Sequence, residues 1–385
     1  MNQKLTCVAP FSSLYITGTG VANPCCVFHG GEKKFIKFDK DLKTNFDQIN
    51  QPYRQDFLDP NWSLENYFSC RVCNMPGTTQ RHLHNNSADP NIDYVQNPTL
   101  TNLHLKFSNL CNLACRMCDG FSSNLILNEK DTDLAGTNPD KNNVITNISR
   151  DSVFYKSILD NLKNLRYLWF SGGETLLHDQ VWEIIRELYR QNLSQNITLH
   201  INTNGTVKLT DEEIQMLKSF KGLNFHVSVD GIGKLTEYIR TNMVWDKWLE
   251  NFKVYYDEFS SNADFAVVTT ISTFNVHKVT EIKKFFRENF RLTPSLNYVY
   301  GRREELAAFN INDRAKQYLY DLYTSNKDDD REKIFKYLEN PRTLDPARIA
   351  DIIDARDNRI IENSFHKNYV AFRNVDPEWY ELLRS

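Results

Sequence analysis

From about residue 100 onward, hydrophobic and polar positions follow two patterns that alternate along the chain. Short stretches in which apolar residues alternate with polar ones, or run together, predict β-strands. The stretches between them place apolar residues every three or four positions, which predicts amphipathic helices. Two such helices cover Val181–Tyr189 and, with an aromatic stripe, Trp248–Phe259. The predicted strands are Leu103–Ser108, Tyr167–Ser171, Ile197–Asn202, Asn224–Val229, Phe265–Ser272 and Leu296–Tyr300.

Six strand–helix repeats in succession predict an α/β fold with a parallel sheet, either curled as a partial barrel or laid open. We assign residues 100–303 to this repeating core. Residues 304–385 are charged and helical in pattern, so we expect them to form a helical C-terminal extension.

The first 95 residues have a different pattern and are expected to form a small α+β domain. Ser13–Thr17 and Val27–His29 resemble short strands, and Lys34–Phe38 resembles a return strand after a glycine turn. A polar stretch rich in Asn, Gln and Asp follows over residues 39–61. An aromatic, helix-like patch then covers Trp62–Phe68.

Composition and charge exclude several classes of protein. Hydrophobic residues make up 41% and charged residues 25% of the chain, which is typical of globular proteins. The 46 basic and 49 acidic side chains give a net charge of −3, which does not favour a nucleic-acid partner. No apolar run approaches the roughly 18 residues of a membrane span, and the first residues lack the apolar core of a secretory signal. We therefore expect a cytoplasmic protein without a membrane partner.

The cysteines are unevenly distributed, since all eight lie within residues 7–118. In a reducing compartment such clustering indicates metal binding or catalysis rather than disulfides. Cys111, Cys115 and Cys118 lie in the run FSNLCNLACRMCDG, directly after the first predicted strand of the core. Three thiolates on one loop can hold a [4Fe-4S] cluster through three irons and leave the fourth iron open. Zinc sites, in contrast, usually have four protein ligands arranged as separated pairs.

Three further predicted strands end in glycines and polar residues. These ends are Gly172-Gly173-Glu174, Thr203-Asn204-Gly205 and Ser228-Val229-Asp230-Gly231. Paired glycines let the backbone approach a ligand closely, and the adjoining carboxylate can pair with an ammonium group. Barrels bind their ligands at this edge of the sheet. Each turn alone is common, but the set that begins with the cysteine triplet is not.

Together these motifs resemble the radical S-adenosylmethionine superfamily, and the resemblance covers roughly residues 100–300. It implies a partial (β/α)6 TIM-like barrel and a [4Fe-4S] cluster ligated by Cys111, Cys115 and Cys118. The open iron of the cluster would bind the amino and carboxylate groups of S-adenosylmethionine. Reductive cleavage would give a 5′-deoxyadenosyl radical that abstracts a substrate hydrogen, with a flavodoxin- or ferredoxin-type protein as electron donor.

The resemblance also implies how the methionyl end of the cofactor is bound. Glu174 and the backbone of Gly172 and Gly173 would hold its ammonium group. Arg240 is a candidate partner for its carboxylate, because a guanidinium group makes bidentate pairs with carboxylates.

Other residues would bind the remainder of the cofactor. By the same resemblance Asn204, Ser228 and Asp230 would contact the ribose or the polar end. Asn275 occupies a further polar position after the fifth strand. Met117 stands where an aromatic residue is common in the superfamily, and its polarizable side chain can still cover the adenine ring.

The N-terminal cysteines resemble a second site. The spacing of Cys7, Cys25, Cys70 and Cys73 resembles the twitch fold, a shortened relative of the SPASM domain. This implies an auxiliary [4Fe-4S] cluster with four protein ligands, although in relatives the module usually follows the barrel. Cys26 is an alternative ligand to Cys25. A zinc site with the same four thiolates remains an alternative to the cluster.

The expected function is therefore that of a radical S-adenosylmethionine enzyme. Auxiliary clusters in similar enzymes either accept an electron from the substrate radical or brace the active site. Electron acceptance would make the protein a dehydrogenase or a crosslinking enzyme, and we favour a peptide or protein substrate. The alternatives are modification of a small molecule or a nucleic acid, and a non-catalytic zinc or iron–sulfur scaffold or sensor.

Overall fold

The structure of the chain is a computed structural model. It describes residues 7–17, 20–26, 28, 34–59, 61, 63, 67, 70, 73, 88–127, 148–362 and 370–384. The strands of these residues form one nine-stranded sheet in the order β3-β2-β1-β4-β5-β6-β7-β8-β9. The strands are β1 (Ser13–Ile16), β2 (Val21–Asn23), β3 (Lys34–Phe35), β4 (Asn102–Leu105), β5 (Tyr167–Phe170), β6 (Thr198–Thr203), β7 (Gly222–Ser228), β8 (Asp264–Ile271) and β9 (Ser295–Tyr298).

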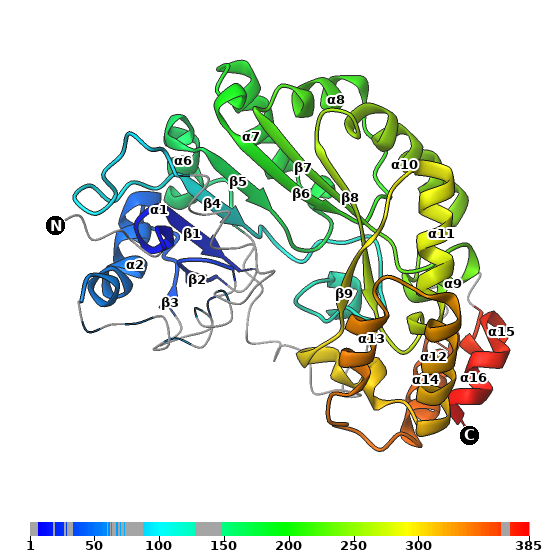
Figure 1. Cartoon of the computed structure of the whole chain (residues 1–385). Helices are drawn as coiled ribbons and strands as arrows, with labels where there is room; N and C mark the ends of the chain where they lie inside the picture. Colours follow the sequence, from blue (N-terminus) through cyan, green and yellow to red (C-terminus); the bar gives the residue numbers. More distant parts are fainter. Residues whose placement is uncertain are drawn as a thin grey trace.

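Helices cover the outer side of the curved sheet and gather at its C-terminal end (Figure 1). The α-helices are α1 (Ala9–Ser12), α2 (Leu42–Leu58), α5 (Asn124–Leu127), α6 (Val153–Asp160), α7 (Asp179–Arg190), α8 (Asp211–Lys218), α9 (Lys234–Ile239), α10 (Trp245–Phe259), α11 (Val279–Phe290), α12 (Asp313–Asn326), α13 (Arg331–Leu338), α14 (Arg348–Glu362), α15 (Phe372–Val375) and α16 (Pro377–Arg384).

Strands β4 to β9 are the six strands predicted from the sequence, with ends that differ by up to three residues. Each pairs in parallel with the next. The prediction of an α/β fold with a parallel, partial-barrel sheet and a helical C-terminal region is therefore confirmed.

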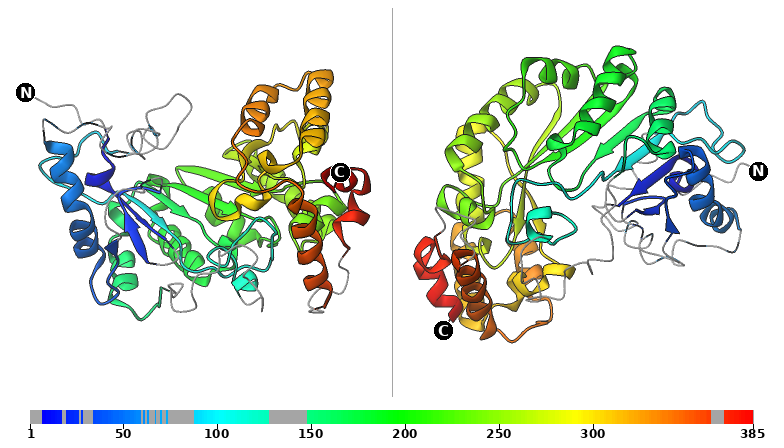
Figure 2. Two further views of the ribbon diagram at one scale, coloured as in Figure 1. Left: turned by 90° about the horizontal axis from the view of Figure 1, so that it is seen from below. Right: turned by 180° about the vertical axis from the view of Figure 1, so that it is seen from behind.

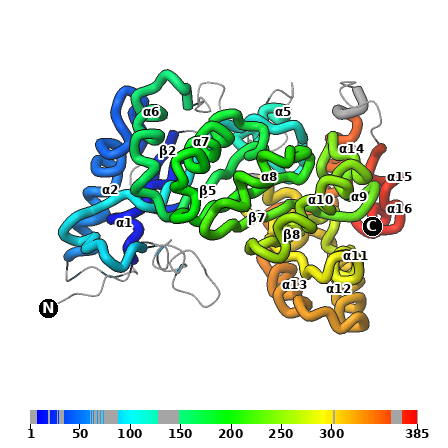
Figure 3. Tube along the Cα trace, turned by 90° about the horizontal axis from the view of Figure 1, so that it is seen from above, coloured from blue at the N-terminus to red at the C-terminus, as the bar shows by residue number. Residues whose placement is uncertain are grey.

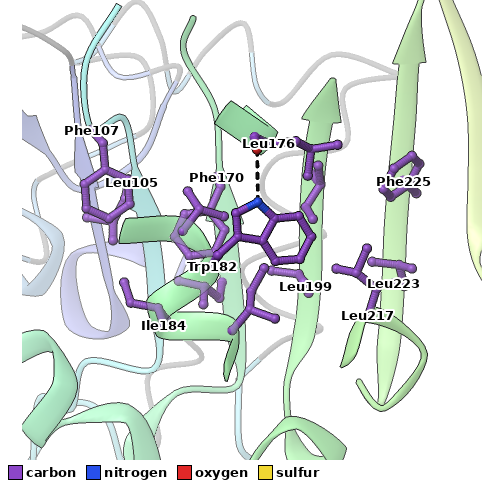
Figure 4. Packing of buried hydrophobic residues seen from close by; sticks show 14 of the residues in the cluster. Leu105, Phe107, Phe170, Leu176, Trp182, Ile184, Leu199, Leu217, Leu223 and Phe225 are labelled. Atoms are coloured by element: carbon purple, nitrogen blue, oxygen red, sulfur yellow. Dashed lines mark hydrogen bonds between the residues drawn. The ribbon is translucent and has the colours of Figure 1, made fainter. Parts of the chain in front are cut away.

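The hydrophobic core lies between the sheet and its outer helices. Every second residue of a strand, such as Leu199 and Ile201 of β6, is fully buried in one large cluster with the apolar faces of the helices. Within this layer the indole nitrogen of Trp182 on α7 donates a 2.9 Å hydrogen bond to the main-chain oxygen of Leu176 (Figure 4). The core residues therefore face the helices and leave the intervening positions to the concave side.

The N-terminal strands belong to the same sheet as the barrel core. Strand β1 pairs in parallel with β4, and β2 and β3 continue the sheet in antiparallel pairs. The expected boundary between residues 95 and 100 therefore does not separate two sheets. The strand expected at Ser13–Thr17 is present. The next described strand is Val21–Asn23, and Val27 and His29 of the strand expected at Val27–His29 lie outside the described residues.

Helix α2 was not predicted, because residues 39–61 appear polar as a whole. Its buried residues nevertheless include Leu42, Phe46, Ile49 and Tyr53, which share one helical face. The Asp41 side chain caps the helix by accepting a hydrogen bond from the Thr44 amide. The predicted aromatic patch that follows lies outside the described residues except for Ser63 and Tyr67.

The C-terminal extension packs on a second apolar cluster. This cluster joins α12 to α16 with α9 and the end of β8. Two further views place the N-terminal strands and the C-terminal helices at opposite ends of the sheet (Figure 2), and the view from above agrees (Figure 3). In the part of the chain that the structure describes, no helix has the length and apolar character needed to cross a membrane.

Candidate functional site

The cysteine triplet lies on the loop that follows β4, at the carboxyl edge of the sheet. Cys111 and Cys115 are buried, and Cys118 is partly exposed. The loop backbone is bound to the end of α9, since the Ala114 amide donates to the Thr241 oxygen (3.0 Å) and the Arg116 amide to the Ile239 oxygen (2.8 Å). The loop therefore has a fixed place against the barrel.

The three thiols interact with one another. The Cys115 thiol donates a hydrogen bond to the Cys118 sulfur, which raises the pKa of Cys115 and lowers that of Cys118. Burial raises the pKa of Cys111 to about 11, and the nearby Cys118 adds to this shift. The positive charge of Arg240 favours the thiolate form of both Cys115 and Cys118. A soft, thiolate-only donor set with a neighbouring cation fits an iron–sulfur cluster.

Among the described residues, no three His, Cys, Asp or Glu side chains, the cysteine triplet included, are arranged as a group that could hold a metal ion. The role of the triplet as cluster ligands therefore remains a prediction.

The Gly172-Gly173-Glu174 turn after β5 lies directly under the cysteine loop. Gly172 and Gly173 have φ angles of +89° and +46°, a region that favours glycine. A Cβ atom on Gly173 would lie 2.1 Å from the Leu110 oxygen, and one on Gly172 would lie 2.1 Å from Cγ of Lys106. The Glu174 amide donates a 2.7 Å hydrogen bond to that same Leu110 oxygen. The turn therefore needs both glycines to pack against the residues before Cys111.

The Glu174 carboxylate is fully buried and joins two strand ends. It accepts hydrogen bonds from the Thr203 hydroxyl (2.7 Å) and from the amides of Asn204 (2.6 Å) and Leu176 (3.1 Å). Burial raises the pKa of Glu174, while these hydrogen bonds oppose the shift. These hydrogen bonds use most of the acceptor capacity of the Glu174 carboxylate within the protein. They favour a structural role for Glu174, in addition to the contact with the methionyl ammonium group that is expected from the sequence.

Asn204 connects this network to the first cysteine. Its side-chain amide donates to the Cys111 sulfur (3.8 Å) and to the Asn112 side chain (2.9 Å). Its side-chain oxygen accepts from Thr206. The ends of β5 and β6 and the cysteine loop are thus one hydrogen-bonded unit.

Asp230 and Arg240 form a buried ion pair beside the other two cysteines. Nε of Arg240 lies 2.7 Å from a carboxylate oxygen of Asp230. Burial alone would lower the pKa of Arg240, but Asp230 and the sulfur atoms of Cys115 and Cys118 raise it overall. The arginine therefore remains charged next to the thiols, with Asp230 as its partner in this structure.

Asn275 binds main-chain atoms next to this ion pair. Its amide nitrogen donates to the main-chain oxygens of Asp230 and Thr270, both at 2.9 Å, and its oxygen accepts from the Ser272 amide at 2.8 Å. These contacts give Asn275 a role in positioning the Asp230 main chain, and its contact with the cofactor remains a prediction. Two other predicted residues lie nearby: Ser228 is the last residue of β7, and Met117 packs on the apolar cluster of the C-terminal extension.

The concave side of the sheet carries a row of rings that sequence reasoning missed. Tyr15, His104, Trp169 and His200 occupy one register line across β1, β4, β5 and β6. Neighbouring ring centroids are 4.5, 4.1 and 4.3 Å apart, and His226 of β7 follows at 4.5 Å. The signal was available: in each strand these rings alternate with the Leu, Ile and Phe residues of the core, so they must face the opposite side.

This row of rings is uncharged where its pKa values are resolved. Burial lowers the pKa of His200 to about 3 and also lowers that of His226. The Tyr167 hydroxyl and the Asn202 side chain occupy the two ring nitrogens of His200. His200 and His226, the rings of this row whose pKa values are resolved, are therefore neutral at pH 7.

The N-terminal cysteines lie at the other end of the sheet. Cys7 precedes α1, and Cys25 and Cys26 follow β2. The Cys26 sulfur is near enough to Tyr167 to contribute to the raised pKa of this tyrosine, after burial. The ligand set Cys7, Cys25, Cys70 and Cys73 remains a prediction.

Residues 105–288 match the family model described as the Radical SAM superfamily. This segment is a Radical SAM domain. It contains the cysteine triplet, the glycine turn and the Asp230–Arg240 pair. No curated protein matches the chain.

Several solved structures are similar to parts of this chain. One is anSMEcpe with bound AdoMet and the Cp18Cys peptide, at 17% identity and a TM-score of 0.41 over 59% of this chain and 60% of that one. Another is Streptococcus suis SuiB bound to the precursor peptide SuiA, at 13% identity and a TM-score of 0.38 over 82% of this chain and 69% of that one. The chain thus spans about 60% of the length of the first of these structures.

Proposed function

We propose that this protein is a radical S-adenosylmethionine enzyme that oxidises or crosslinks a peptide or protein substrate. The observation that carries the proposal is that the three thiols of the cysteine loop lie near enough to interact electrostatically at the carboxyl edge of the sheet. The buried Glu174 network lies on one side of this loop, and the Asp230–Arg240 pair lies on the other.

Cys111, Cys115 and Cys118 would hold a [4Fe-4S] cluster. When bound, such a cluster with an open iron supplies the electron that cleaves S-adenosylmethionine to the hydrogen-abstracting 5′-deoxyadenosyl radical. The residues of this chain would bind the cluster and orient the cofactor. The positive charge of Arg240 favours the thiolate forms of Cys115 and Cys118, and thiolate is the form that binds iron.

The chain's other residues would position the cofactor. Glu174 holds the glycine turn in place, so that the main-chain oxygens of Gly172 and Gly173 are available to the methionyl ammonium. Arg240, already paired with Asp230, is the cation nearest the expected carboxylate. Ser228 and Asn204 would contact the ribose, and Met117 the adenine.

The substrate would bind on the concave side of the sheet. The His200 and His226 rings there are neutral at pH 7, which suits peptide groups and does not favour the phosphates of a nucleic acid. The N-terminal cysteines would hold an auxiliary [4Fe-4S] cluster that accepts the electron of the substrate radical. A flavodoxin- or ferredoxin-type protein would reduce the first cluster.

The test is the metal content of anaerobically purified protein and its cleavage of S-adenosylmethionine under dithionite. The wild-type protein should bind about eight irons and form 5′-deoxyadenosine. A variant with Cys111, Cys115 and Cys118 changed to Ala should lose about four irons and all cleavage. A matched variant with Cys7, Cys25, Cys70 and Cys73 changed to Ala should retain about four irons and the basal cleavage. If the triplet variant loses no iron, the proposal fails; retained zinc with about four irons would make the N-terminal site structural.

A further inference from the structure

Arg116, the residue directly after the second cysteine, is bound by the C-terminal extension. Arg116 is fully buried, and its Nη2 lies 2.9 Å from Oδ1 of Asp357 on α14, which is itself only 2% exposed. The guanidinium carbon lies 3.8 Å from the centre of the Tyr238 ring, and Nε donates to the Tyr238 main-chain oxygen (3.1 Å). The contacts with Asp357 and with Tyr238 therefore fix the orientation of Arg116.

Asp357 is fixed in turn by its own contacts. Its Oδ1 also accepts a hydrogen bond from the Tyr238 hydroxyl (3.0 Å), and its Oδ2 accepts one from the Phe372 amide (2.7 Å). Helices α9, α14 and α15 therefore meet at this one carboxylate. Burial raises the pKa of Asp357, and the charge of Arg116 opposes this shift.

Two further arginines of the C-terminal part bind the backbone of the cysteine loop. Nη1 of Arg356, next to Asp357 on α14, donates to the main-chain oxygen of Arg116 (2.9 Å). Nη1 of Arg303 donates to the main-chain oxygen of Cys118 (2.8 Å). With the amide contacts to α9 on the other side, both faces of this part of the loop are bound.

A buried ion pair contributes little net stability compared with a well-packed apolar pair, because both charges lose their hydration. It does impose a direction, since a guanidinium group and a carboxylate bind only in a narrow range of geometries. The expected consequence of the Arg116–Asp357 pair is therefore orientation of the loop that carries Cys115 and Cys118.

We propose that α14, together with Arg303, is a clamp on the cysteine loop, in which Asp357 is a positioning residue for Arg116, and Arg303 and Arg356 hold the loop carbonyls. The clamp fixes the orientation of the backbone that carries Cys115 and Cys118. This inference rests on the proposed function, because it concerns the same cluster. It assigns to the C-terminal extension a role in retaining the cluster.

The first test is an Asp357→Asn variant, which removes one charge and preserves the size of the side chain. The exposed Asp351 on the same helix gives the matched control, Asp351→Asn. Iron release to a chelator should be at least ten times faster in Asp357→Asn than in the wild type and in Asp351→Asn. The EPR signal that shifts when S-adenosylmethionine is added should broaden in Asp357→Asn alone, since a merely structural change would not alter this signal.

Two more variants keep the test decisive. If Asp357→Asn does not fold, as judged by circular dichroism, Arg356→Gln leaves the ion pair intact and should still speed iron release. A double Arg116→Met/Asp357→Leu variant should fold with an apolar pair in place of the charges and still release iron rapidly. Wild-type iron retention in this double variant, or in a folded Asp357→Asn, would overturn the clamp. A wild-type protein that binds no iron in the triplet would instead overturn the proposed function.

Discussion

Gly173 gives the sharpest test of how the strand end after β5 supports the cysteine loop. A Cβ atom there would lie 2.1 Å from the Leu110 oxygen, whereas ordinary contact begins at 3.4 Å, so the loop must move by about 1.3 Å. The residue directly after Leu110 is Cys111. The same oxygen accepts the 2.7 Å hydrogen bond from the Glu174 amide, so this bond would be lost when the loop moves.

The magnitude follows from these two terms. A side chain at the positive φ of Gly173 costs about 1–3 kcal/mol. An unmade buried hydrogen bond costs about 1–3 kcal/mol more. We therefore expect Gly173→Ala to lower the free energy of unfolding by about 2–6 kcal/mol, which is a large part of the stability of a typical domain.

Gly233 provides the matched control. Its φ is +56°, but an added Cβ atom would meet nothing within 4 Å. Gly233→Ala should therefore lower the free energy of unfolding only by the cost of its backbone conformation. Its iron content should equal that of the wild type. The assay is urea denaturation of anaerobic protein together with its iron content. Equal stability and equal iron in Gly173→Ala and Gly233→Ala would show that the close approach to Leu110 does not support the cysteine loop.

Three other perturbations test the fold around the site. Lys283→Met removes a 2%-exposed cation that lies 2.6 and 2.8 Å from two aspartates, so the free energy of unfolding in urea should fall by about 3–5 kcal/mol. Lys284→Met changes the exposed neighbouring side chain and should lower it by less than about 1 kcal/mol. Equal losses in the two variants would contradict this reasoning. Trp182→Phe loses a 2.9 Å indole hydrogen bond and should lower the melting temperature. Trp169→Phe removes a buried indole nitrogen that has no hydrogen-bond partner and should not lower it. A lower melting temperature in Trp169→Phe than in Trp182→Phe would refute this expectation. Burial lowers the pKa of His178 to about 4, so the unfolded chain takes up a proton below pH 6.5 before the folded one does. Stability should therefore fall by up to about 3 kcal/mol between pH 6.5 and 4, and His178→Leu should reduce this slope in denaturation curves recorded across that range.

The parallel sheet could be predicted because its signal is local. Leu199 and Ile201 alternate with His200 and Asn202, and the same alternation recurs in each neighbouring strand. Helix α2 was missed because its apolar residues are few and spread over a polar segment, so only their helical spacing reveals them. The pairing of β1 with β4 could not be predicted, since both strands are four residues long and the segment between them is long.

The candidate site likewise has features that the sequence predicts and features that it does not. The cysteine triplet, the glycine turn and Glu174 are short motifs, so the sequence places them at strand ends without further knowledge. The partners of the charged groups are not local. Arg240 pairs with Asp230 ten residues earlier, which spacing alone does not select, and Asn275 reaches back to the same aspartate from the end of the next strand.

Contacts between residues far apart in the sequence bear directly on the cysteine loop. Arg356 binds the main-chain oxygen of Arg116 across a separation of 240 residues. No periodicity or motif in the charged C-terminal segment predicts this, because an arginine or aspartate on a helix is usually solvated. Burial is what changes the interpretation: Arg116 and Asp357 are 0% and 2% exposed, so each charge requires the other. The loop that carries the thiols and the helix α14 therefore have to be correctly placed together, so the C-terminal extension supports the candidate site directly.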